Sequence, residues 1–72
     1  VGIGETTPTA RLHVKGSGND ATTTALLVQN SDGTDMLKVT DDGTLVAPNL
    51  PTSATGLPTG AIWNDGGTLK IA

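Results

Sequence analysis

The sequence predicts an all-β protein made of short strands and tight turns. One reason is a strand–turn pattern within ALLVQNSDGTDMLKVTDDGTLVA, residues 25–47, where Asp32-Gly33-Thr34 recurs ten residues later as Asp42-Gly43-Thr44. Asp-Gly between apolar runs is the strongest short signal for a hairpin, because Gly adopts a positive φ without steric cost. The other reason is composition, since Gly, Thr, Asp and Asn are abundant and Glu and Lys are few, which favours strands and turns over helices.

The 72 residues suffice for one small domain but lack the large side chains that usually form a core. There is no Phe, Tyr or Cys, and there is a single Trp. Scaffolds of this size usually need disulfides, a metal or oligomerisation. Disulfides are excluded without Cys, and one His without thiols does not suit zinc. We therefore expect an oligomer. Disorder is the alternative for so polar a chain, but the regular spacing of Val, Leu and Ile between turns argues against it.

Charge and hydropathy exclude two classes of partner. The net charge is −3, and the four basic residues are scattered, which does not suit nucleic acid. No apolar run approaches the roughly 20 residues of a membrane span, so we expect no membrane insertion. The chain begins at Val1 without a signal pattern, from which we expect a fragment, a processed chain or a portion of a longer protein.

Residues 1–15 predict a glycine-rich turn followed by a strand. Gly2-Ile3-Gly4 lacks the third glycine of a dinucleotide-binding fingerprint, so we expect its glycines to let the backbone bend or approach a neighbouring chain closely. After a Thr-Pro turn, residues 11–15 alternate between polar and apolar, as a half-buried strand does. His13 then points to solvent, away from Leu12 and Val14. Residues 16–24 form a loop by composition.

Alternation assigns the two faces of the strands in residues 25–47. Five apolar side chains share the inward face: Leu26, Val28, Leu37, Val39 and Leu45. Gln29, Lys38 and Thr40 alternate outward, whereas Leu27 and Met36 break the pattern. The aspartates here lack the spacing of an EF-hand loop, so we interpret them as solvated turn residues, with a surface calcium site as the alternative.

The last third of the chain predicts a connector and a hairpin. Residues 48–60 hold three prolines and two glycines, which exclude a helix or a central strand, and Leu50 and Leu57 would tether this connector. Residues 61–72 form a terminal hairpin around Asp65-Gly66-Gly67. Trp63 is expected to close a small core, with stacking on a glycan as the alternative.

Three stretches resemble segments of bacteriophage tail-fibre proteins: VGIGETTPTARLHVKGSG, ALLVQNSDGTDMLKVTDDGTL and GAIWNDGGTLKIA. The resemblance implies a homotrimer whose strands wind around a common axis, serving as the shaft or tip of a virion fibre. Some such fibres hold a metal ion on the axis through a His-x-His pair. Arg11 and Lys15 stand where the second histidine would be, so we expect no metal at His13.

Together these observations predict one fibre module over residues 1–72, an intertwined homotrimeric β fibre without an independent monomer core. We expect an extracellular structural segment of the virion that provides mechanical extension and display, with no catalytic residue and no cofactor. Its partners would be two identical chains, other tail-fibre or baseplate proteins and a bacterial surface receptor. A glycan-binding tip and a non-phage extracellular filament or adhesin are the alternatives.

The expected trimer core is Ile3, Leu12, Val14, Leu26, Val28, Leu37, Val39, Leu45, Ile62, Leu69 and Ile71. The expected turn glycines are Gly33, Gly43 and Gly66.

Overall fold

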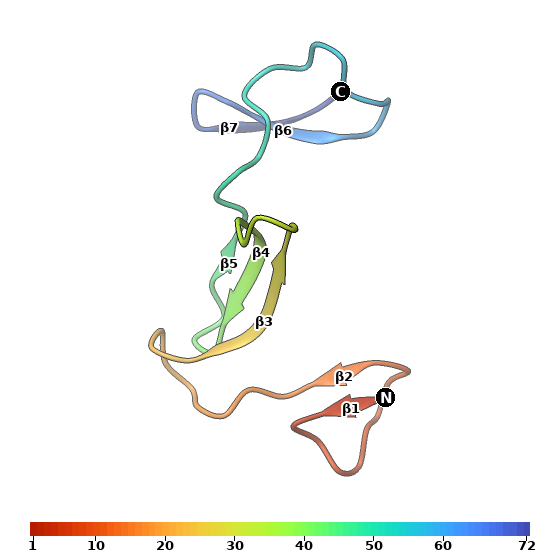
Figure 1. Cartoon of the computed structure of the whole chain (residues 1–72), viewed down its shortest axis with the longest axis vertical. Coiled ribbons are helices and arrows are strands. Elements are labelled where there is room, and N and C mark those ends of the chain that lie inside the picture. Colours follow the sequence, from red (N-terminus) through yellow and green to blue (C-terminus); the bar gives the residue numbers. More distant parts are fainter.

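The computed structural model describes residues 1–72 and consists of short strands without any helix, which confirms the predicted all-β class. The strands form three small sheets that follow one another along the long axis of the molecule (Figure 1). Accordingly, no helix is present that could cross a membrane. The strands are β1 (Gly2–Ile3), β2 (His13–Val14), β3 (Thr24–Gln29), β4 (Asp35–Thr40), β5 (Leu45–Val46), β6 (Ile62–Asp65) and β7 (Thr68–Ile71).

The N-terminal sheet pairs β1 with β2 in parallel, with Gly2 opposite His13. The strand predicted over residues 11–15 is therefore limited to two residues, because its partner β1 is equally short. Gly4 has a φ of 73°, and a Cβ at this position would overlap the carbonyl oxygen of Lys15. The close approach that requires this glycine is thus made within the chain.

The middle sheet is antiparallel, in the order β3–β4–β5. Val39 lies opposite Leu26 on one side and Leu45 on the other, so these three side chains share a face. The register shifts twice along β3 and β4, which leaves Ala25 and Met36 as extra, unpaired residues. Such bulges interrupt the alternation of side chains, and this is why Met36 departs from the sequence pattern.

The two Asp-Gly turns of the middle sheet have the same backbone hydrogen bonds. Asn30 N donates to Thr34 O (3.1 Å) in the first turn, and Thr40 N donates to Thr44 O (3.0 Å) in the second. The glycines Gly33, Gly43 and Gly66 have φ values of 80°, 91° and 60°. A side chain at such a position would be strained, so the repeat in the sequence corresponds to a repeat in the turn geometry.

The terminal hairpin, β6–β7, is closed by Gly66 and Gly67, since Asp65 already pairs with Thr68 inside the ladder. The connector that precedes it is hydrogen-bonded at both ends. Asn49 Nδ2 donates to Asp35 O in the middle sheet (2.8 Å), and Pro51 O accepts from Asn64 N in the hairpin (2.8 Å).

The chain has no apolar core. No hydrophobic side chain is buried, and the single buried residue is Thr40, with 7% of its surface exposed. The Cα radius of gyration is 14.9 Å, compared with about 11 Å for a compact domain of this length. Backbone hydrogen bonds and polar contacts therefore hold the single chain together, in an elongated shape of 43 × 26 × 25 Å.

Candidate functional site

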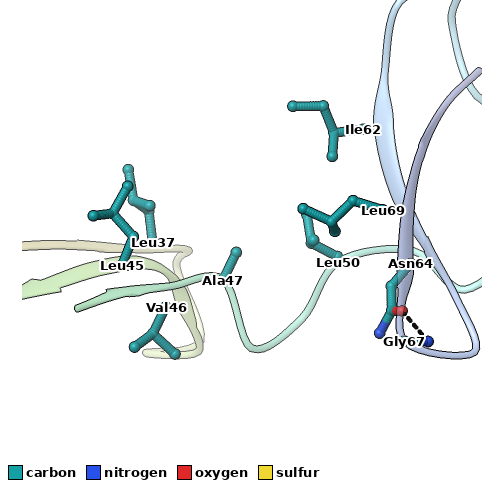
Figure 2. A pocket seen from close by; sticks show the side chains of 9 residues that line it. All are labelled: Leu37, Leu45, Val46, Ala47, Leu50, Ile62, Asn64, Gly67 and Leu69. Carbon is teal, nitrogen blue, oxygen red and sulfur yellow. Dashed lines mark hydrogen bonds between the residues drawn. The ribbon is translucent and has the colours of Figure 1, made fainter.

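An apolar groove of about 500 Å³ lies between the middle sheet and the terminal hairpin (Figure 2). Seven of its nine lining residues are hydrophobic, and none is charged. The lining consists of Leu37, Leu45, Val46, Ala47, Leu50, Ile62, Asn64, Gly67 and Leu69.

Strand register places the apolar side chains of the groove. On the middle sheet, Leu37 and Leu45 project to the same side, whereas Val46 projects to the other (Figure 2). On the hairpin, Leu69 lies opposite Asn64 and therefore shares its face. The connector supplies Leu50 between the two. Segments that are distant in the sequence thus contribute to one apolar surface.

The chemistry of the groove suits contact with another apolar surface. Leu45 and Leu69 are 73% and 67% exposed, so the lining is open to solvent. The side chain of Asn64 is the one polar side chain in the lining, and its Oδ1 already accepts a hydrogen bond from Gly67 N (2.7 Å). The lining therefore offers no acid, base or nucleophile, but it does offer several aliphatic side chains.

The groove contains four of the residues predicted to form a trimer core: Leu37, Leu45, Ile62 and Leu69. None of the eleven predicted residues is buried in the single chain. Val14, Leu26, Leu37 and Val39 are half-buried, and the other seven are exposed. Ile3 and Leu12 belong to the N-terminal part of the chain, at the opposite end from the hairpin (Figure 1).

His13 does not face solvent, contrary to the prediction from alternation. Its side chain is 30% exposed, whereas Leu12 is 60% exposed. The loop between β1 and β2 folds back over the imidazole, so that Nδ1 accepts a hydrogen bond from Thr9 N (3.2 Å) and Nε2 lies 3.9 Å from Glu5 Oε2. These contacts with the loop override the simple alternation.

Glu5 is the residue that organises this N-terminal cluster, and the sequence did not point to it. Its carboxylate accepts a hydrogen bond from Thr7 N (3.1 Å) and lies 3.6 Å from Lys15 Nζ. The hydrogen bond from Thr7 lowers the pKa of Glu5, and the positive charge of Lys15 lowers it further. The cluster links the loop after β1 to the end of β2.

Thr40 and Asp41 also differ from the prediction that they are outward or solvated. Thr40 is buried, and its Oγ1 donates to Asp42 Oδ1 (2.5 Å). The carboxylate of Asp41 accepts hydrogen bonds from Gly18 N (3.0 Å) and Thr23 Oγ1 (2.5 Å). Asp41 therefore anchors the loop over residues 16–24 to the end of β4, a contact between segments that no local pattern indicates.

A metal site is not formed by the acidic residues, because no group of three or more His, Cys, Asp or Glu side chains lies close enough together to hold an ion. Two of the aspartates, Asp20 and Asp42, instead accept hydrogen bonds from residues two positions away. Asp20 and Asp42 both have a lowered pKa for this reason, through bonds from Thr22 and Thr40 respectively.

Trp63 lies on the face of the hairpin opposite to the groove, in register with Lys70. Lys70 Nζ is 5.7 Å from the ring centroid and 2.6 Å from Asp65 Oδ2, so the cation covers the indole and pairs with the carboxylate. The indole Nε1 is buried without a hydrogen-bond partner. Trp63 therefore packs within the terminal hairpin and does not line the groove.

Comparison with protein-family models, curated proteins and solved structures found no match to the chain.

Proposed function

We propose that this chain is a structural segment of a homotrimeric β fibre, part of a bacteriophage tail fibre that extends and displays its tip outside the cell. The observation that carries the proposal is the absence of any buried hydrophobic side chain in a chain with regular hydrogen-bonded sheets. The resemblance of three stretches to phage tail-fibre segments supports the trimer and the virion.

Interchain burial supplies the free energy that the single chain lacks. Burying one Leu, Ile or Val side chain fully stabilises by about 1.5–3 kcal/mol relative to leaving it exposed. Ten large hydrophobic side chains are exposed in the single chain. Covering even a few of them per chain would therefore stabilise a fibre whose small sheets are only marginally stable alone.

The groove is the surface that we expect neighbouring chains to cover first. It joins the middle sheet to the hairpin, and its lining carries no charge that would have to be neutralised. The edge strands add a second means of association, because β3 and β7 each pair on one side only. Unpaired strand edges readily accept a strand from another chain.

The glycan-binding alternative receives less support from the hairpin. A sugar that stacked on Trp63 would have to displace Lys70, whose ammonium lies over the ring and pairs with Asp65. Contact with baseplate proteins or a bacterial receptor remains part of the proposal for the whole fibre.

Native mass spectrometry combined with dilution tests the proposal. We expect a species of three times 7.2 kDa that loses its sheet signal in circular dichroism when dilution dissociates it. A folded monomer that unfolds cooperatively, independent of concentration, would overturn the fibre proposal.

A further inference from the structure

Three Asp-Gly steps occur in the chain, at residues 32–33, 42–43 and 65–66, and the fold treats their carboxylates differently. All three aspartates are exposed. We propose that Asp32 is a site of spontaneous backbone isomerisation to isoaspartate, and that the fold protects Asp42 and Asp65 from the same reaction.

The reaction needs only the chain and water. The backbone nitrogen of the glycine attacks Cγ of the preceding aspartic acid, a C–N bond forms, and the carboxyl oxygen leaves as water. Water then opens the resulting five-membered imide at either carbonyl. One opening restores aspartate, and the other leaves the chain linked through the β-carboxyl group. Glycine allows this attack because it has no Cβ to crowd the ring.

The carboxylate of Asp32 accepts no hydrogen bond and forms no ion pair. Its turn is capped by another residue. Asn30 Oδ1 accepts hydrogen bonds from Asp32 N (2.9 Å) and from Thr34 N (3.1 Å). The side chain of Asp32 is therefore free to rotate until Cγ meets the nitrogen of Gly33.

In the second turn, Asp42 itself performs the capping that Asn30 performs in the first. Its Oδ1 accepts from Thr40 Oγ1 (2.5 Å) and from Thr44 N (3.1 Å). These bonds hold the carboxyl group away from Gly43 and favour its ionised form, which is the poorer electrophile. The two glycine nitrogens are equivalent, because each donates to the carbonyl three residues earlier, so the side chain alone distinguishes the turns.

Asp65 is held in a third way, by the ion pair of its Oδ2 with Lys70 Nζ (2.6 Å). This pair lies along the ladder of the terminal hairpin, because Lys70 faces Trp63 across the two strands. Rotation of the Asp65 carboxyl group toward Gly66 would break the pair. In contrast, isomerisation at Asp32 would add a methylene group to the backbone at the tip of the β3–β4 hairpin. No hydrogen bond or ion pair of the Asp32 carboxylate has to break for this reaction.

Ageing of the folded full chain at neutral pH, followed by peptide mapping with electron-transfer fragmentation, tests the inference. We expect isoaspartate to accumulate at residue 32 about ten-fold faster than at residues 42 and 65, the factor expected from one charge-assisted hydrogen bond. In denaturant, the hydrogen bonds of Asp42 and the ion pair of Asp65 are lost. We therefore expect the isomerisation rates of the three aspartates to agree within about two-fold.

The variant Lys70→Met is the matched test of the structural cause, because it removes the ion pair from an exposed position. We expect its Asp65 to isomerise at a rate that approaches that of Asp32, while the rate at Asp42 stays low. Three results would each overturn the inference. The first is an equal isomerisation rate at the three aspartates of the folded chain, and the second is the same ten-fold preference for Asp32 in denaturant. The third is an isomerisation rate at Asp65 that Lys70→Met leaves unchanged.

Discussion

Single polar side chains link distant segments of this protein, and Asp41 does so most clearly. Its carboxylate binds Gly18 N and Thr23 Oγ1, and its own nitrogen donates to Thr23 O (3.0 Å). A Cβ at Gly16 would overlap the same carboxylate. The loop over residues 16–24 is therefore shaped around this one side chain.

We expect Asp41→Ala to lower the free energy of unfolding by about 1–3 kcal/mol, because it leaves two donors without their acceptor. Asp32→Ala is the matched control, since the Asp32 carboxylate has no partner, and we expect a change of about 0.5 kcal/mol or less. Chemical denaturation of the assembled protein measures both. Equal effects of the two substitutions would show that the loop is not anchored through Asp41.

At the scale of the elements, β4 is the strand on which the middle sheet depends, because it pairs on both edges. Its neighbouring residues Lys38 and Val39 belong to opposite faces. Val39 lies between Leu26 and Leu45, whereas Lys38 lies between Leu27 and Val46. A slip in register by one residue would exchange these faces.

The proposed trimer predicts opposite results for two substitutions on β4. Val39→Asp would bring carboxylates together on the covered face without partners, which is severely unfavourable, so we expect assembly to fail. Lys38→Asp keeps a charge on the other face, and we expect an intact trimer with stability changed by about 0.5 kcal/mol or less.

Size-exclusion chromatography separates these outcomes. An intact Val39→Asp trimer together with a dissociated Lys38→Asp variant would mean that the covered face of the middle sheet is the one that carries Lys38.

At the scale of the whole molecule, three small sheets lie in line (Figure 1). An apolar groove lies between the last two of them (Figure 2). Because the groove is open in the single chain, we expect substitutions in its lining to act mainly through contacts between chains. Leu69 suits this comparison, since it lines the groove and is 67% exposed.

We expect Leu69→Lys to weaken assembly at least about ten-fold in dissociation constant, because it places a charge in a surface that neighbouring chains would cover. Thr68→Lys, one residue earlier on the opposite face of the same strand, is the control and should assemble normally. Analytical ultracentrifugation measures both. Normal assembly of Leu69→Lys would show that the groove stays open in the fibre.

Residues that are close in the chain were enough to predict the class of the fold and its main hairpins. Asp-Gly steps set the turns, since the positive φ of Gly33 and Gly43 depends on the residue itself and its immediate neighbours. Alternation likewise placed Leu26, Val39 and Leu45 on one face of the middle sheet.

Contacts between distant segments lay beyond such reasoning. The parallel pairing of β1 with β2 and the anchoring of residues 16–24 by Asp41 both join residues more than ten positions apart. The loop that covers His13 likewise contacts it through Thr9 and Glu5, outside the alternation of the strand. The groove, too, forms only because the connector brings the hairpin to the end of the middle sheet. Local propensities are set within a few residues, whereas these contacts depend on which remote backbone donors and acceptors the folded chain brings within hydrogen-bonding distance.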